Sequence, residues 1–448
     1  MPNQFLSPEG DLENYFVTEY WLIDQWVGDT LWGWGRNGFS STSPLGSNDT
    51  IQRTTPVTTF AGGTNWKQVS GGNSCAAAIK TDGTLWMWGI NTGGQLGNNT
   101  TSQSNTPVTT FAGGTNWKQV ACGSSHTAAI KTDGTLWTWG SNAAGQLGDN
   151  TTANQSIPVT TFAGGTNWKQ VASGFQHTAA IKTDGTLWTW GPNNNGQLGV
   201  NDTNTRCTPV TTFAGGTNWK QVSCGYNHTT AIKTDGTLWT WGRNAYGQLG
   251  DNTATTKCTP VTTFAGGTNW KQVASGNFYT AAIKTDGTLW TWGINTSGQF
   301  GDNTIINRST PVTTFAGGTN WKQVACGGTY TAAIKTDGTL WTWGANTSAN
   351  LGDNTLINRS TPVTTFAGGT NWKQVGCMVA STAAIKTDGT LWNWGSNGYA
   401  DLGTNDTTQR LTPVTTFAGG TNWKLVSSGR GRFTFAVTSG TDSTYFIS

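Results

Sequence analysis

Charged residues are scarce in this chain of 448 residues, since Lys, Arg, Asp and Glu make up only 10% of it, against roughly a quarter of an ordinary globular protein. The net charge is +3, which is too small and too dispersed for a protein that binds nucleic acid by neutralising many phosphates. No apolar run reaches the length of about 18 residues that a membrane span needs, so we expect no membrane insertion. The N-terminus also lacks the basic and apolar segments of a secretory signal.

Histidine and cysteine are few as well. Three His in the whole chain are sparse for acid–base catalysis, and no Ser–His–Asp order or pair of carboxylates is discernible. Seven Cys is an odd number without the spacing of a disulfide scaffold, which favours assembly in reducing surroundings inside a cell. Cys207 and Cys258 occupy equivalent loop positions one repeat apart, and the sequence leaves open whether they pair. We expect no enzyme activity and no cofactor.

The sequence is rich in one repeated phrase. PVTTFAGGTNWK begins at Pro56 and recurs seven more times, so that its Trp returns at intervals of 51 residues. A period of that size, made of short β segments with 62 Gly and 26 Trp in the chain, indicates the blades of a propeller. The repeated Trp residues are Trp66, Trp117, Trp168, Trp219, Trp270, Trp321, Trp372 and Trp423.

One unit is interpreted as four strands, A to D, with a tight Asp-Gly turn between C and D. Strand A is PVTTF, strand B is NWKQVA, strand C is HTAAIKT and strand D is GTLWTWG. Simple alternation in strand B predicts that Trp117 and Gln119 share one face and that Val120 points to the other. In strand D it places Trp137 and Trp139 on one face, where they can pack against a neighbouring blade.

The two ends of the repeat array are incomplete in complementary ways. The last unit has strands A to C without a D strand, whereas TLWGWG at 30–35 is a D strand with no A, B or C before it. We therefore predict an all-β, eight-bladed propeller of four-stranded antiparallel blades, closed by an N-terminal strand. The propeller is assigned to residues 29–438, and 439–448 to a C-terminal tail or edge strand.

The segments LWTWGSNAAGQLGDN, WKQVACGSSHTAAI and DGTLW resemble the repeat of the regulator-of-chromosome-condensation family of β-propellers. The resemblance recurs in all eight units and implies the propeller fold. The family ring usually has seven blades, whereas this sequence has eight units. Because a propeller hosts many unrelated functions, the resemblance implies an interaction scaffold or a nucleotide-exchange-type adaptor without establishing either.

Residues 1–28 precede the repeats and are predicted to form an acidic amphipathic helix that serves as a docking arm. Ser7 fits an N-cap, Pro8 the first turn and Gly28 the end of such a helix. Residues 1–35 contain six acids and no Lys or Arg. The helix either packs on the ring or docks to a partner protein. Its apolar stripe consists of Leu12, Tyr15, Phe16, Tyr20, Ile23 and Trp26.

The units differ mainly in two loops, the B–C loop and the long D–A loop. In an up-and-down blade these two loops emerge on one face of the disc, which we call the variable face. The unchanging A–B loop and C–D turn emerge on the other, which we call the uniform face. Loops on a rigid scaffold commonly carry binding, and aromatic and Arg side chains among Asn and Ser favour it. The predicted binding residues are Phe175, Gln176, Tyr226, Asn227, Arg243, Tyr246, Phe278, Val379 and Arg430.

A column of residues at the start of strand C raises the question of a metal site, because it contains three His and a Cys on adjacent units. Ligands spread around a wide ring do not converge on one ion, so we predict no metal. The family resemblance implies instead that this side chain caps the start of strand C. The column reads Cys75, His126, His177, His228, Tyr279, Tyr330, Ser381 and Arg432.

The near-identical units indicate recent tandem copying. With the Thr/Asn/Gly surface and the acidic arm, they resemble appendage or decoration proteins of tailed-phage particles. The leading hypothesis is a non-enzymatic structural protein of a virion, assembled in the host cytoplasm. Its arm would hold a capsid or tail protein, and its variable face a host-surface glycan or protein. The alternative is a cytoplasmic protein–protein interaction scaffold or nucleotide-exchange-type adaptor. Neither hypothesis involves nucleic acid.

Overall fold

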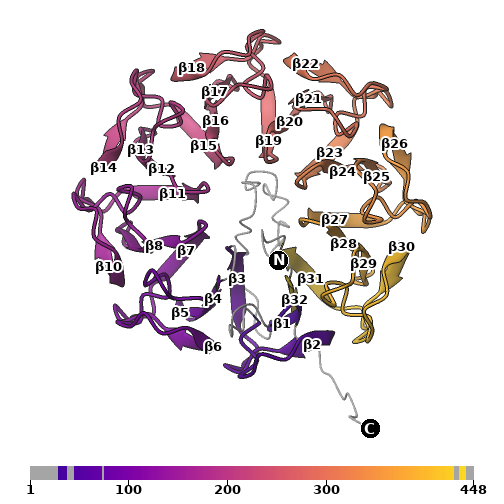
Figure 1. Cartoon of the computed structure of the whole chain (residues 1–448), viewed down its shortest axis with the longest axis horizontal. Helices are drawn as coiled ribbons and strands as arrows, with labels where there is room; N and C mark the ends of the chain where they lie inside the picture. Colours follow the sequence, from indigo (N-terminus) through magenta and orange to yellow (C-terminus); the bar gives the residue numbers. More distant parts are fainter. Residues whose placement is uncertain (1–28, 38–44, 73–74, 428–432, 440–448) are drawn as a thin grey trace, which may run out of the picture.

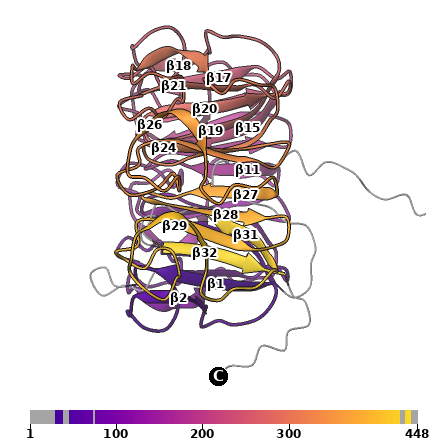
Figure 2. The same cartoon turned by 90° about the vertical axis from the view of Figure 1, so that its right-hand side faces the viewer.

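The computed structural model describes residues 29–37, 45–72, 75–427 and 433–439. Eight four-stranded antiparallel sheets surround a common axis like the blades of a propeller (Figure 1), and the ring is a thick disc when seen on edge (Figure 2). The predicted eight-bladed all-β propeller is confirmed. The predicted helix over 1–28 lies outside the described residues, as do Arg430, Arg432 and residues 440–448.

Each blade begins at the axis with a strand B and continues outward with a strand C. The innermost strands are β3 (Trp66–Gly71), β7 (Trp117–Cys122), β11 (Trp168–Ser173), β15 (Trp219–Cys224), β19 (Trp270–Ser275), β23 (Trp321–Cys326), β27 (Trp372–Cys377) and β31 (Trp423–Ser427). The second strands are β4 (Cys75–Lys80), β8 (His126–Lys131), β12 (Thr178–Lys182), β16 (His228–Lys233), β20 (Tyr279–Lys284), β24 (Tyr330–Lys335), β28 (Ser381–Lys386) and β32 (Phe433–Thr438).

A strand D and a strand A complete the blade on the outside. The third strands are β5 (Leu85–Gly89), β9 (Leu136–Gly140), β13 (Leu187–Gly191), β17 (Leu238–Gly242), β21 (Leu289–Gly293), β25 (Leu340–Gly344), β29 (Leu391–Gly395) and β1 (Thr30–Gly35). The outermost strands are β6 (Ser104–Thr109), β10 (Gln155–Thr160), β14 (Arg206–Thr211), β18 (Lys257–Thr262), β22 (Arg308–Thr313), β26 (Arg359–Thr364), β30 (Arg410–Thr415) and β2 (Arg53–Thr58).

The sequence repeat and the structural blade are offset by one strand. In the sheet β3-β4-β5-β6, strands B, C and D of one unit pair with strand A of the next unit. The remaining sheet, β2-β1-β32-β31, joins the two ends of the described chain. There β1 pairs antiparallel with β32 along its whole length, from Thr30 opposite Thr438 to Gly35 opposite Phe433.

A β-bulge at the start of strand B changes which side chains share a face. In β7 the register shifts between Trp117, opposite Lys131, and Gln119, opposite Ile130. The extra residue inverts the alternation, so Trp117 and Val120 belong to one hydrophobic cluster. Gln119 points the other way and donates from Nε2 to the carbonyl of Val171 in the next blade, at 3.2 Å. The predicted common face for Trp117 and Gln119 is therefore wrong.

The core lies between the blades. Trp117 and Trp139 pack with Ile79 and Leu85 of the preceding blade, and the two indole rings meet edge to face at 5.9 Å. Trp137 packs against the same cluster, which confirms the predicted common face of the strand D tryptophans. Equivalent clusters recur around the ring, so each blade buries its tryptophans against its neighbour. Among the described residues no helix is long and apolar enough to cross a membrane.

Replacing Trp117 by Ala is predicted to lower the free energy of unfolding by about 3–5 kcal/mol, because a large buried side chain leaves a cavity between two blades. Trp117 is 2% exposed, whereas Phe111, six residues earlier in the same unit, is 63% exposed. Phe111→Ala is the matched control and should change the free energy by no more than about 0.5 kcal/mol. Guanidinium unfolding of both variants measures the difference, and equal losses would contradict this account of the core.

Candidate functional site

Backbone hydrogen bonds link neighbouring loops within each face of the disc. On the uniform face, the amide of Trp117 donates to the carbonyl of Gly83 in a C–D turn at 2.9 Å. On the variable face, the amide of Ser124 donates to the carbonyl of Phe175 at 3.2 Å, which links the B–C loops of adjacent blades. The repeated and the variable loops therefore occupy opposite ends of the disc.

Five of the predicted binding residues form one contiguous cluster, which we call the aromatic ledge. The rings of Phe175 and Tyr226 stack with centroids 4.2 Å apart, and Tyr226 is followed by Phe278 at 6.1 Å. Tyr246 packs on Phe278 at 5.5 Å. The Arg243 guanidinium lies 5.4 Å from the centroid of Phe278 and 5.9 Å from that of Tyr246. All five side chains are partly exposed.

The ledge is assembled from the B–C loops of three consecutive blades and one D–A loop. Each B–C loop is closed by a backbone bond, such as the one from the amide of Gly225 to the carbonyl of His228 at 2.9 Å. The Arg243 amide donates to the carbonyl of Asn227 at 2.9 Å, and the Tyr246 amide to Oε1 of Gln248 at 3.0 Å. These bonds hold the rings in place before any ligand arrives.

The other predicted binding residues are distributed around the ledge. Gln176 is exposed next to Phe175, and Asn227 is half-buried next to Tyr226. Val379 is 46% exposed and lies in the β27–β28 loop, two blades beyond Phe278. Gln176 and Asn227 therefore belong with the ledge by position, whereas Val379 marks a separate point on the same face.

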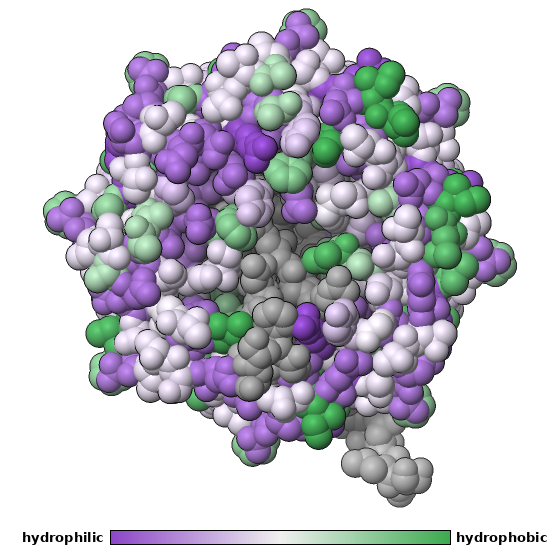
Figure 3. Space-filling model, in the orientation of Figure 1, coloured by the Kyte–Doolittle hydropathy of each residue, from purple (hydrophilic) through white to green (hydrophobic). Residues whose placement is uncertain are grey.

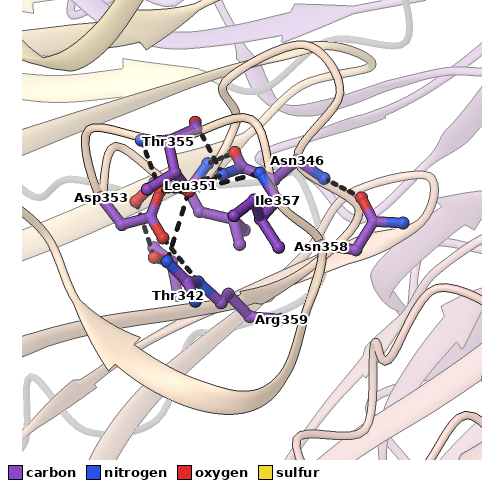
Figure 4. A network of polar contacts seen from close by, with 8 residues as sticks. All are labelled: Thr342, Asn346, Leu351, Asp353, Thr355, Ile357, Asn358 and Arg359. Carbon is purple, nitrogen blue, oxygen red and sulfur yellow. Dashed lines mark hydrogen bonds and ion pairs between the residues drawn. The ribbon is translucent and has the colours of Figure 1, made fainter.

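The long D–A loops are stiffened by a buried asparagine (Figure 4). In the β25–β26 loop, Nδ2 of Asn346 donates to Oδ1 of Asp353 and to the carbonyl of Thr355, both at 2.9 Å. Its Oδ1 accepts the amide of Leu351 at 3.0 Å, and Nε of Arg359 donates to Asp353 at 2.7 Å. Burial opposes the ionised form of Asp353, but the bonds from Thr355 and Arg359 outweigh it and lower the pKa of this carboxyl.

Four exposed aliphatic side chains at the tips of two neighbouring D–A loops were not among the predicted binding residues. Hydrophobic residues stand out at the periphery near β22 and near β26 (Figure 3). At the same places the other loops carry mostly Thr, Ser, Ala or Asn, so a comparison of loop tips alone identifies them. These aliphatic tips are Ile305 (65% exposed), Ile306 (59%), Leu356 (48%) and Ile357 (62%).

The column that starts strand C joins neighbouring blades. Nε2 of His177 lies 3.0 Å from Oγ1 of Thr229, and the Tyr279 hydroxyl donates to the carbonyl of Tyr330 at 2.5 Å. In turn the Tyr330 hydroxyl donates to the carbonyl of Ser381 at 2.5 Å. The column therefore makes blade-to-blade contacts, and the expected cap stays a prediction. Among the described residues no three His, Cys, Asp or Glu are grouped to hold a metal ion.

The seven cysteines all lie in the described part of the chain, and no two of them form a disulfide. Cys207 and Cys258 are half-buried and unpaired to each other, whereas Cys75, Cys122, Cys224 and Cys377 are buried. The Cys326 thiol faces the carbonyl of Ala274 in the preceding blade at 3.6 Å, and burial raises its pKa to about 12. These interior thiols are small packing groups rather than nucleophiles.

Tyr279 and Tyr330 predict a loss of stability at alkaline pH. Burial raises the pKa of both hydroxyls well above the ordinary value, which is about 10. As the pH rises past about 10, the unfolded chain releases these protons before the folded one does, so the free energy of unfolding falls. In a variant with both residues changed to Phe, this fall should be smaller between about pH 8 and about pH 11.

Tyr399→Phe is the control, because Tyr399 is 36% exposed. It should reproduce the alkaline behaviour of the wild type when urea unfolding is measured across the same range. An unchanged pH dependence in the double variant would show that the two buried hydroxyls do not contribute to it.

Comparison with known proteins shows that the repeats match known families of repeats. The model of the RCC1-like domain matches residues 26–304, and models of the regulator of chromosome condensation (RCC1) repeat match 286–334, 337–385 and 321–349. The ultraviolet-B receptor UVR8 of Arabidopsis thaliana is 33% identical over 343 residues, which are 75% of this chain and 77% of the receptor.

Two further matches differ in what they cover. The human E3 ubiquitin-protein ligase HERC2 is 27% identical over 78% of this chain, but the match spans only 7% of the ligase. The structure of Prp20p from Saccharomyces cerevisiae, described with its binding to Gsp1p and histones, covers 81% of this chain and 93% of its own, with a TM-score of 0.62 and 19% identity. That similarity shows the shared fold.

Proposed function

The chain belongs to the RCC1-like domain family, and from this premise we propose that it is a non-enzymatic protein-binding propeller whose aromatic ledge contacts the partner. The ledge is the observation that carries the proposal. Aromatic and Arg side chains are enriched at the centres of protein interfaces, and rings that are already packed lose little conformational entropy on binding. A ledge built from three consecutive blades also offers a surface much wider than a single loop.

The aliphatic tips extend this surface. Ile305 and Ile306 belong to the β21–β22 loop, in the same blade as Phe278 of the ledge. The bonded loop framework seen around Asn346 holds such tips without burying them. We propose that the tips form a second apolar contact at the rim, used together with the ledge by one extended protein partner.

The relatives favour a protein partner over the other predicted ligands. Prp20p is described with its binding to two kinds of protein. The ligase HERC2 contributes no activity here, because the match spans 7% of it. No relative reported above is named as a virion protein, so attachment to a phage capsid or tail and binding of a host glycan stay predictions. The interaction scaffold is the better supported hypothesis, and a nucleotide-exchange role is a finer prediction within it.

Changing Phe175, Tyr226 and Phe278 together to Ala is predicted to weaken partner binding by about 2 kcal/mol or more, roughly 30-fold, as expected for the centre of an interface. Immobilised full-length chain recovers the partner from an extract of the source cells. The purified partner is then titrated against each variant by calorimetry. The stability of the triple variant should change little, because all three side chains are partly exposed.

The matched control changes three exposed phenylalanines of the uniform face, Phe111, Phe162 and Phe213, to Ala. They are 63%, 65% and 64% exposed, so the same kind and number of side chains are removed. The control should bind as the wild type does. Equal affinity of the ledge variant and the wild type, or equal losses in both variants, would refute the proposed role of the ledge.

A further inference from the structure

A ring of eight lysines surrounds the axis at the uniform face. Each is the second residue of an innermost strand. In seven of these strands the amide of the first residue donates to a C–D turn of the uniform face, as Trp117 does to Gly83. Figure 1 shows these eight strands closest to the axis. The lysine ring consists of Lys67, Lys118, Lys169, Lys220, Lys271, Lys322, Lys373 and Lys424.

The other main groups of charges in the repeat units have neighbours of opposite sign. In strand C, Lys131 lies over the rings of Trp117 and Trp137 at 4.7 and 4.8 Å, and its own hairpin carries Asp133 two residues later. In the D–A loops, Asp202 pairs with Arg206 at 2.5 Å, and Asp353 pairs with Arg359. The repeat units therefore balance these charges locally.

Five members of the lysine ring have no such balance. Its five exposed members are Lys118, Lys169, Lys220, Lys322 and Lys373. Across the described part of the chain, none of these five lies within ion-pair distance of an acidic group. Like charges gathered around one axis repel each other and attract an anionic ligand.

One member of the lysine ring, Lys424, already pairs with a carboxylate from the segment before the first repeat. Nζ of Lys424 lies 2.9 Å from Oδ2 of Asp29, and the Asp29 side chain is only 2% exposed. Asp29 is the first described residue, and its carbonyl accepts the amide of Trp66 at 2.9 Å. Asp29 thus takes the place that Gly83 has in the following unit, where the carbonyl of Gly83 accepts the amide of Trp117. The described chain therefore begins at the uniform face, beside the lysines.

The composition of residues 1–28 complements the ring. They contain Glu9, Asp11, Glu13, Glu19 and Asp24 and no Lys or Arg. A segment of this length reaches at most about 90 Å when extended, which is ample to cross the axis. Its covalent attachment gives it a high effective concentration at the ring, on the order of millimolar for a short flexible tether.

We propose that the acidic segment 1–28 docks on the lysine ring of its own chain. The five carboxylates neutralise the exposed lysines, and the Asp29–Lys424 pair is the first contact of this interaction. Because the other ring lysines are exposed or half-buried, the attraction is screened by salt. The uniform face is then covered by the chain itself, and the variable face at the other end of the disc stays open.

Protease cleavage tests this docking, because the only Glu residues of the chain are Glu9, Glu13 and Glu19. A Glu-specific protease therefore cuts the full chain only within the segment. We expect the wild type at low salt to be cut roughly tenfold more slowly than a variant with the five exposed ring lysines changed to Gln. Raising the salt to about 0.5 M should remove most of the protection.

The matched control changes five strand C lysines, Lys131, Lys182, Lys233, Lys284 and Lys335, to Gln. It removes the same charge from the same protein and should leave the cleavage rate as in the wild type. Wild-type cleavage as fast as that of the ring variant would overturn the proposal. So would equal acceleration by the control, or protection that rises with protein concentration, since either points to diffuse attraction or to a second molecule.

Carbodiimide cross-linking of the unmodified protein gives an answer even if the ring variant does not fold. The reagent joins carboxylates to amines in direct contact, and mass spectrometry then locates the joined peptides. We expect links from the segment to Lys118, Lys169, Lys220, Lys322 or Lys373 within monomeric chains. Links mainly to strand C lysines, or mainly between two chains, contradict docking on the ring.

Discussion

The contact between adjacent blades is the interaction on which the rest of the molecule depends. The carbonyl of Gln95, in the D–A loop of one blade, accepts Nε1 of Trp139 at 2.9 Å and Oγ1 of Thr127 at 3.0 Å from the next blade. The equivalent carbonyls of Gln146, Gln197, Gln248, Gln299, Asn350 and Asp401 accept the same pair of groups. One geometry repeated around a circle requires one framework sequence, which accounts for the recurring Thr of strand C and Trp of strand D that make these bonds.

Because of this constraint, the sequence can vary only at positions that do not contribute to the contact between blades. B–C loops and the tips of D–A loops touch the inter-blade core with a few fixed residues, such as the buried Asn346, and are otherwise exposed. The ledge arises because Phe175 and Tyr226 occupy the same loop position in adjacent blades, and the ring spacing brings them to 4.2 Å. On the uniform face the units do not differ, so the same lysine occurs in all eight units and forms a ring.

Much of this architecture could be predicted from the sequence, because period and strand signals repeat eight times. The division into two faces follows from strand count alone, and the aromatic residues of the variable face are visible as departures from the repeat. The direction of the Gln119 side chain could not be predicted from the alternation of side chains along a strand, because the bulge after Trp117 adds one residue to the strand. The ring-to-ring contacts of Tyr226 with its neighbours required blade spacing that no single unit encodes. Ile305 and Ile306 were not predicted because only aromatic, Arg and amide side chains and Val379 counted as signs of binding, although a comparison of the loop tips identifies them.

The central claim is that recognition belongs to the ledge and not to the repeated framework. A photoreactive benzoylphenylalanine placed at position 226, in the middle of the ledge, tests this in the cells that make the protein. Position 213, an exposed Phe of the uniform face, serves as the comparison. Irradiation should join position 226 to one defined protein and leave position 213 without that adduct. The same adduct at both positions, or an adduct at 213 alone, would contradict the account.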